Sequence, residues 1–459
     1  MEIKPKGRQR EVLYLPTEGH YVVLGSAGSG KSTVAVLRSR YLADSGLDHA
    51  GRVLLVTYTQ ALTKYLAQLV GPAGPSVDVL TLHTVGRNAL AATGATDLYD
   101  AWAMKRLQEQ AISAFKQSHP THRLAGRPTR FFVDEFAWIA GHGIEDKAAY
   151  VEADRVGRAS ARLMRADRGT MFDIYISYLS VRGEAGYDYD LQDMPHRLHL
   201  ALRDGKARLP YKHVVIDEAQ DFPPEVLRAA SQIIPDDGSV TVFADYAQQI
   251  YGHRMSWRSA GLSVSKLWEL DGNYRNTKQI SAVAGAIAVL PGFEVDDLRP
   301  LTPARQDGPA PTLTHCATVD AESRCIAANV ERFASQGNVA VLARTVGDRQ
   351  RLASILPSGA KKLDRNLNGL APDGIYYGTL HAAKGLEFDS VHIAHCSSDH
   401  LPDPQASDAL GVDEARAEDL RLLYVGVTRA RTNLAISYVG TKSQLLPVDP
   451  GLFEERSIQ

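Results

Sequence analysis

Residues 25–33 read GSAGSGKST, and this glycine-rich segment constrains the fold more than any other part of the sequence. It follows the apolar residues 21–24 and precedes the helix-like residues 34–37, so a strand, a loop and a helix are predicted in that order. Glycines let consecutive backbone N–H groups turn inward around an anion at the positive end of a helix. The alternative is a glycine-rich turn that matches the pattern by chance, and the flanking strand and helix argue against it.

The segment therefore predicts a phosphate-binding loop for a nucleoside triphosphate. Lys31 would reach the β- and γ-phosphates, and the Ser32 hydroxyl would bind Mg²⁺. The predicted nucleotide-binding residues of the loop are Gly25, Ser26, Ala27, Gly28, Ser29, Gly30, Lys31, Ser32 and Thr33.

A second part of the same site is predicted far along the chain. The apolar residues 213–216 lead into DEAQD at 217–221, which is typical of a buried strand that carries carboxylates at its C-terminal end. Asp217 would hold Mg²⁺ directly or through water, and Glu218 would orient or deprotonate an attacking water. Solvated loop acids are the alternative, and the phosphate-binding loop makes it the weaker one.

A similar acid pair, Asp134 and Glu135, also follows an apolar run. It lacks the Gln-Asp that follows the first pair, and the apolar residues continue through Ile139. We expect an amphipathic helix with both acids facing water rather than a second catalytic pair.

Composition limits the class of protein. With 459 residues, 44% of them hydrophobic, the chain can form two or three domains with cores. The three cysteines Cys316, Cys325 and Cys396 form neither a disulfide framework nor a CxxC metal motif, so a reducing cytoplasm is expected. No apolar stretch is long enough for a bilayer, and the charged N-terminus is unlike a signal peptide. The net charge of −2 neither requires nor excludes a nucleic-acid partner.

The pattern of strands and helices predicts an α/β protein with an insertion. Residues 20–83 and 206–270 alternate β-branched runs with helical patterns, as in a parallel sheet. Residues 101–115 and 171–179 are the clearest helices of a region that breaks this pattern. We predict a first domain from residues 1–86 and 206–270, a helical accessory insertion at 87–205, and a second α/β domain at 271–459, with the most linker-like stretch at 291–311.

The order of the motifs resembles the UvrD/Rep family of superfamily 1 DNA helicases, from about residue 8 to about residue 438. Besides the phosphate-binding loop, the similar segments are LLVTYTQALTKYL (54–66, motif Ia), TLHTVG (81–86, Ib), VVIDEAQDF (214–222, II), VFADYAQQIYGHR (242–254, III), LDGNYRNTKQI (270–280, IV), GTLHAAKGLEFDSV (378–391, V) and EDLRLLYVGVTRAR (418–431, VI). The resemblance implies two RecA-like parallel-sheet P-loop domains, the cofactors ATP and Mg²⁺, and a DNA-dependent ATP hydrolase.

The resemblance also implies roles at the nucleotide. Gln9 matches the residue that reads adenine, Tyr274 the residue that stacks on it, and Glu387 the residue that contacts the sugar. Gln248 matches the sensor of the γ-phosphate.

Arg275 and Arg429 match cations that the second domain brings to the γ-phosphate when the domains close. Solvent-facing helix charges are the alternative for such arginines. The motif VI context argues against it for Arg429, but not for Arg431.

Aromatic and hydrogen-bonding residues would line a single-strand track, because any base offers a face for stacking. The matched positions are Tyr58, Thr81, His83, Tyr251, Arg254 and His381. Ordinary packing is the alternative for the two tyrosines. The chain has His253 where the family often has tryptophan, and Trp257 would either compensate or belong to a core.

Arginines in the predicted insertion recur at helical spacing. On one helix they would form a basic stripe that touches nucleic-acid phosphates. A solvated or internally paired face is the alternative. The residues are Arg155, Arg158, Arg162, Arg165 and Arg168.

The segment from Ile280 to Gly378 is too short for the second large insertion that the family usually carries, so strong unwinding by this chain alone is not expected. Two functions remain open, with single-stranded DNA or a single/double-strand junction as partner and no membrane. One is a 3′ to 5′ translocase or helicase in DNA repair or processing. The other is a regulatory ATPase that senses nucleic acid and controls a partner such as a nuclease. A small-molecule phosphotransferase is disfavoured by motifs Ia, Ib and V.

Overall fold

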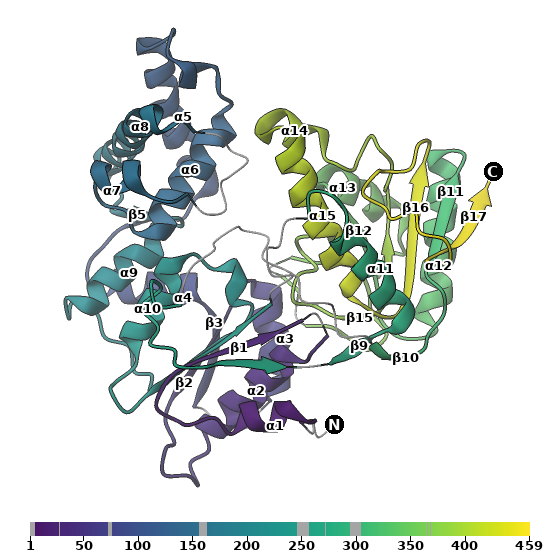
Figure 1. Cartoon of the computed structure of the whole chain (residues 1–459), viewed down its shortest axis with the longest axis horizontal. Helices are drawn as coiled ribbons and strands as arrows, with labels where there is room; N and C mark the ends of the chain where they lie inside the picture. The colour runs from purple at the N-terminus through teal and green to yellow at the C-terminus, as the bar shows by residue number, and fades with distance from the viewer. Residues whose placement is uncertain are drawn as a thin grey trace.

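The computed structural model describes residues 5–26, 28–71, 76–155, 163–245, 257–270, 272–293, 304–364, 366–367 and 369–459, with the backbone alone at 274, 305, 409 and 410. Figure 1 shows two sheet-containing parts side by side, with a group of helices above the first of them.

The first sheet is parallel and has six strands in the order β3-β2-β6-β7-β1-β8. Its strands are β1 (Gly19–Gly25), β2 (Val53–Thr57), β3 (Val77–Thr81), β6 (His213–Ile216), β7 (Ser239–Ala244) and β8 (Leu267–Leu270). Val22 and Leu24 pack into a core on one face, whereas Val23 between them packs on the other. Because successive side chains of a strand point to opposite faces, this β-branched sheet is buried on both sides.

Three helices cover each face of that sheet. One face carries α1 (Arg8–Leu13), α2 (Lys31–Leu42) and α3 (Gln60–Val70), and the other carries α4 (Leu82–Ala91), α9 (Met194–Arg203) and α10 (Pro224–Ile233).

The helical insertion has a core of its own, to which Phe132, Phe136 and Tyr178 contribute. Its helices are α5 (Ala101–Ser118), η1 (Arg123–Gly126), α6 (Thr129–His142), α7 (Lys147–Glu152) and α8 (Arg165–Glu184). The chain enters and leaves the insertion at one place, where β4 (Asp97–Leu98) pairs with β5 (Tyr189–Asp190). This separate core makes the insertion a distinct packing unit (Figure 1).

The second sheet is also parallel, with seven strands in the order β13-β14-β12-β15-β16-β11-β17. Its strands are β11 (Thr312–Cys316), β12 (Val339–Ala343), β13 (Lys361–Lys362), β14 (Ile375–Thr379), β15 (Phe388–Ile393), β16 (Ala430–Val439) and β17 (Glu454–Ile458). The helices of this part are α11 (Lys278–Ala288), α12 (Val319–Ala334), α13 (Val346–Ile355), α14 (Pro404–Leu410) and α15 (Val412–Thr428). A short pair, β9 (Asn273–Thr277) and β10 (Ala304–Gln306), lies beside it.

The architecture confirms the predicted fold class of two parallel-sheet α/β units with a helical insertion in the first. The strand at the C-terminal end, β17, was not expected. The three cysteines are buried and free. None of the described helices is both long and apolar enough to cross a bilayer.

Two expectations about the insertion are wrong. Residues 129–142 do form the helix α6, but only Asp134 is partly exposed, since Glu135 is buried and accepts hydrogen bonds from Tyr150 and Arg155. The single basic stripe fails for the described residues because Arg155 lies outside any helix and is paired with Glu135.

The other described arginines of that set also have local partners. Arg165 pairs with Glu152, and Arg168 donates to the carbonyl oxygens of Val151 and Ala153. Arg158 and Arg162 lie outside the described residues. The internally paired alternative therefore holds for these three arginines.

Candidate active site

The phosphate-binding loop joins β1 to α2, which begins at Lys31. Gly28 and Gly30 have φ values of 81° and 85°, in the left-handed region that favours glycine. A Cβ at Gly28 would lie 2.1 Å from Asn273 Oδ1, and one at Gly30 would lie 2.6 Å from Gln9 Nε2. The backbone conformation therefore favours glycine at both positions, and the close approach of Asn273 and Arg275 adds a steric reason at Gly28. Ala27 lies outside the described residues.

Lys31 is almost fully buried in this loop. Its Nζ donates to the carbonyl oxygens of Gly25 and Ser26 at 2.8 and 3.0 Å and forms an ion pair with Asp245 at 2.8 Å. Asp245 directly follows β7, so the ammonium bridges the ends of two neighbouring strands of the sheet.

Asp217 lies at the end of β6 and is fully buried. Neither of its carboxylate oxygens makes a hydrogen bond of normal geometry. Burial raises the pKa of Asp217 to about 7, helped by the neighbouring Glu218 and opposed by Ser32 and Lys31. A buried carboxylate with unused oxygens beside a hydroxyl is the ligand chemistry that Mg²⁺ uses, so Asp217 and Ser32 fit this ion.

Glu218 has φ 57° and ψ 41°, a left-handed conformation that is uncommon for any residue other than glycine. Burial would raise the pKa of this carboxyl, but Lys31, Arg429 and Lys384 outweigh it and hold the pKa below its usual value. The side chain is therefore ionised at neutral pH, which is the form that a general base requires.

Gln220 connects the two acid-bearing strand ends. Its Nε2 donates to Glu218, and its Oε1 accepts from the backbone N–H of Asp245 at 2.9 Å. Gln248, the predicted sensor, lies outside the described residues.

Two arginines of the second half lie close to the loop and the acids. A Cβ at Gly28 would lie 3.1 Å from the Cβ of Arg275, which places Arg275 beside the loop, where it pairs with Glu387. Arg429 directly follows α15, is 1% exposed, and donates from Nε to the carbonyl oxygen of Val425 at 3.1 Å. Burial and Arg275 lower the pKa of Arg429, whereas Glu218 raises it.

Arg431 differs from Arg429. Its side chain is 54% exposed and lies 3.4 Å from Asp389. Arg431 thus faces solvent, as the alternative expected, but it lies in strand β16 and not on a helix.

Gln9 is hydrogen-bonded to the phosphate-binding loop. Its Nε2 donates to the carbonyl oxygen of Ser29 at 2.9 Å, and its Oε1 accepts from the backbone N–H of Lys6 at 2.8 Å. For Tyr274 only the backbone, in β9, is described.

Two protein families match this chain. The UvrD/REP helicase N-terminal domain matches residues 6–266, and the UvrD-like helicase C-terminal domain matches residues 360–441. The first match alone covers more than half of the chain. The chain belongs to the UvrD/REP helicase family.

Individual relatives agree with this assignment. ATP-dependent DNA helicase UvrD2 of Mycobacterium tuberculosis (strain ATCC 25618 / H37Rv) is 24% identical over 95% of this chain and 79% of its own length. DNA helicase IV of Escherichia coli (strain K12) is 23% identical over 90% of this chain and 65% of its own. As a UvrD/REP family member, the chain is an ATP-hydrolysing DNA helicase of superfamily 1 with two RecA-like domains.

The two halves of this UvrD/REP family member meet at a buried ion pair. Lys384, in motif V, contacts Asp221, the last acid of DEAQD, and both side chains are buried. Beside it, a Cβ at Gly385 would lie 2.4 Å from Leu62 of α3. No role was predicted for Asp221, Asp245 or Lys384, although the position of Asp245 after an apolar strand was a usable signal.

The predicted DNA-contacting residues that are described lie at or shortly after the carboxyl ends of parallel strands, where open sheets bind ligands. Tyr58 follows β2 and is 37% exposed. Its ring centroid lies 5.6 Å from that of Phe222, the residue that follows Asp221 in the sequence. His381 follows β14 and lies 3.8 Å from Glu418 Oε1. Burial, Arg344 and Lys384 lower the pKa of His381 to about 4.

Thr81 and His83 have local roles as well. Thr81 is buried and caps α4 by accepting from the backbone N–H of Thr84 at 3.3 Å. His83 Nε2 lies 3.2 Å from the carbonyl oxygen of Leu191. Tyr251, His253 and Arg254 lie outside the described residues. Trp257 packs against the first domain's core, which was the alternative to a role in stacking on DNA.

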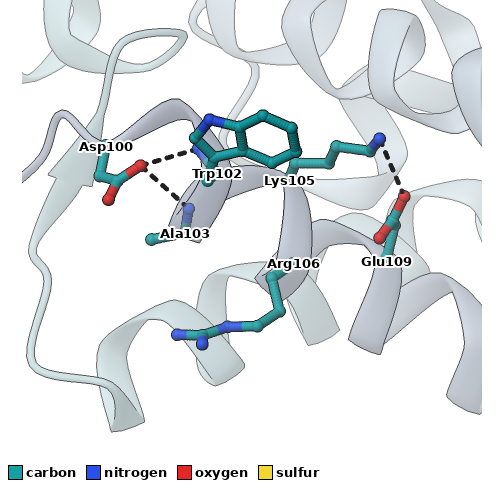
Figure 2. A pocket seen from close by; sticks show the side chains of 6 residues that line it. All are labelled: Asp100, Trp102, Ala103, Lys105, Arg106 and Glu109. Atoms are coloured by element: carbon teal, nitrogen blue, oxygen red, sulfur yellow. Dashed lines mark hydrogen bonds and ion pairs between the residues drawn. The ribbon is translucent and has the colours of Figure 1, made fainter.

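A separate hollow lies on the insertion, around the start of α5 (Figure 2). Trp102 is 81% exposed there, and Asp100 caps the helix by accepting from the backbone N–H groups of Trp102 and Ala103. Lys105 and Arg106 are offset by Asp100 and Glu109, so charge does not mark this hollow as a phosphate site.

Proposed function

We propose that this chain is an ATP-driven motor that moves along single-stranded DNA, 3′ to 5′ as its family resemblance implies. The observation that carries the proposal is that residues of both sheet units contribute to the candidate site. Lys31, Asp217 and Glu218 come from the first sheet unit, whereas Arg275 and Arg429 come from the second. Such a divided site couples each hydrolysis event to closure of the two units.

The roles of the residues follow from their positions. Bound ATP and Mg²⁺ supply the phosphoanhydride bond and a divalent charge. Asp217 and Ser32 would hold the metal, and Lys31 would exchange Asp245 for the phosphates. Glu218 is ionised and would take the proton of the attacking water. Arg275 and Arg429 would stabilise charge on the γ-phosphoryl oxygens.

A contact between the residue that follows the acids and a predicted DNA-binding residue supports the coupling. Phe222 directly follows DEAQD and lies against Tyr58, an exposed aromatic at the end of β2. A small shift of the acids on hydrolysis would therefore reach a ring on which a base could stack. Thr81, His83 and His381 stay predicted DNA contacts.

A second function, a regulatory ATPase that senses DNA ends for a partner nuclease or repair protein, is favoured by one observation. Between α11 and β14, the described residues form β10, β11, α12, β12, α13 and β13, five of which belong to or cover the second sheet. No second helical subdomain occurs among the described residues of this segment. A cytoplasmic location and the partner remain predictions.

ATP turnover with and without single-stranded DNA tests the site. We expect DNA to stimulate the wild type, Lys31→Ala to lose turnover and nucleotide affinity, and Glu218→Gln to lose turnover while it still binds ATP. Full turnover in either variant would refute the assignment of these residues.

Displacement of streptavidin separates the two functions. A motor moving 3′ to 5′ clears streptavidin from a 5′-biotinylated strand faster than from a 3′-biotinylated strand. DNA-stimulated turnover with neither displaced would favour the regulatory ATPase.

A further inference from the structure

A cluster of two histidines and a glutamate lies between α9 and α10, below the helices of the insertion in Figure 1. His196 and His199 are on α9, and Glu225 is the second residue of α10. Residues three apart lie on the same helix face, so both imidazoles point at one carboxylate. Within the ranges that the structure describes, this is the one group of three such residues whose donor atoms could share a metal ion.

The donor atoms converge on a single oxygen. His196 Nδ1 and His199 Nδ1 lie 3.0 and 2.8 Å from Glu225 Oε2, and all three atoms fall within 4.8 Å of one another. Zinc bonds to nitrogen and carboxylate oxygen at about 2.0–2.2 Å, so tetrahedral donors stand about 3.3 Å apart. An opening of a few tenths of an ångström, with release of the two Nδ1 protons to solvent, would replace the two hydrogen bonds by two metal–nitrogen bonds.

Neighbouring groups orient the donors as they do around bound metals. Glu145 Oε1 lies 3.2 Å from His196 Nε2, so a proton can stay on Nε2 while a metal displaces the proton from Nδ1. Arg228 pairs with the other oxygen of Glu225, and it also donates to the carbonyl oxygen of His142 at 3.0 Å. Glu225 is therefore held with Oε2 turned toward the histidines.

Access and space are consistent with this role. Glu225 is buried, but the histidine side chains retain 14% and 18% exposure, so an ion can reach them from solvent. Gly143 closes the other side, where a Cβ would lie 2.3 Å from Glu225 Oε1 and 2.9 Å from His196 Nδ1.

We propose that His196, His199 and Glu225 form a binding site for a zinc-like divalent transition metal, with water completing the coordination. Two imidazole nitrogens and one carboxylate suit Zn²⁺, Co²⁺ or Ni²⁺ rather than Mg²⁺ or Ca²⁺, which prefer oxygen donors alone. The bound ion would join α9, where the chain returns from the insertion, to α10, which follows the catalytic acids.

Cobalt provides the test, because Co²⁺ in a nitrogen- and oxygen-ligated site with few ligands absorbs visible light. The full chain, untagged and freed of metal with a chelator, is titrated with Co²⁺ and, by calorimetry, with Zn²⁺. We expect one ion per chain, a visible absorption band, and a higher melting temperature with Zn²⁺.

Three variants separate metal binding from hydrogen bonding. His199→Gln keeps a donor for Glu225 but should lose the band. Glu145→Gln should weaken Co²⁺ affinity by about 10- to 100-fold, as changes to outer partners of a metal do. His119→Ala, an exposed histidine of the same insertion, is the matched control and should bind like the wild type.

Two outcomes would overturn the proposal. They are the absence of Co²⁺ binding by the wild type and an unchanged affinity in His199→Gln. Either would reduce the cluster to a hydrogen-bonded link between two helices. Because Glu145 is exposed, its variant keeps the test decisive should His199→Gln fail to fold.

Discussion

At the scale of single residues, the unusual environment of Asp217 has a measurable effect on metal binding. The pKa of Asp217 is raised from 3.8 to about 7 by burial, with Glu218 adding to the shift. The metal binds the carboxylate form, so a proton competes with it below pH 7. We expect the dissociation constant for Mn²⁺, a paramagnetic substitute for Mg²⁺, to rise by up to about tenfold per pH unit below 7.

The sign for stability is the opposite of the usual carboxyl case. Because the folded-state pKa is above 3.8, the group's contribution to stability is fully present below that value and is lost as pH rises through about 7. Mg²⁺ should therefore raise the melting temperature more at pH 8 than at pH 6. Mn²⁺ binding followed by electron paramagnetic resonance measures the first effect, and a pH-independent affinity would contradict it.

Residue identities at the strand ends were predictable, but their partners were not. Lys31, Ser32, Asp217 and Glu218 were found because each lies next to an apolar run that defines a strand or a helix. The ion pair of Lys31 with Asp245 joins residues far apart in the sequence, and no local pattern encodes it. The helical periodicity likewise predicted that Glu135 is exposed, because a periodic pattern contains no information about its buried partner Arg155.

At the scale of elements, the phosphate-binding loop depends on Gly28. We expect Gly28→Ala to lower ATP affinity by at least about tenfold, because a Cβ strains the left-handed backbone by roughly 1–2 kcal/mol and also meets Asn273. Titration with a fluorescent ATP analogue measures the loss.

Gly94→Ala is the matched control for this change. Gly94 has φ 85°, but a Cβ there has no neighbour within 4 Å. It should lower the melting temperature slightly and leave ATP affinity unchanged. Equal ATP affinity in both variants would show that Asn273 does not define the loop.

Apolar runs predicted the strands well, whereas the spacing of charged residues did not predict a helix. The runs at 53–56, 240–243 and 339–342 became β2, β7 and β12, because buried parallel strands are continuous apolar segments. The arginine spacing suggested one helix from 155 to 168, but α8 begins only at Arg165. Charged residues carry a weak periodic signal, since they need not pack.

At the scale of the whole molecule, the buried pair of Lys384 and Asp221 links the two sheet units. Lys384→Met would leave Asp221 buried without its ammonium, at a cost of about 3–5 kcal/mol. We expect a large drop in the melting temperature, with substantial recovery in the double variant Lys384→Met/Asp221→Asn.

An exposed lysine provides the comparison for this pair. Lys362 lies 3.1 Å from Asp364, with side-chain exposures of 40% and 26%. Lys362→Met should change stability by no more than about 1 kcal/mol. If Lys384→Met is equally mild, the pair does not hold the units together. The sequence indicated two domains, but the contact between them follows only from their folded arrangement.

The ion pair between Lys31 and Asp245 makes nucleotide uptake an exchange reaction rather than a simple addition of charge. An arriving triphosphate competes with a carboxylate for the same ammonium, so part of its attraction replaces an existing one. The dependence of affinity on ionic strength should accordingly be shallower than the charge of ATP suggests. The displaced carboxylate of Asp245 directly follows β7, near the start of motif III. Nucleotide binding therefore changes the electrostatic environment of motif III at its first residues.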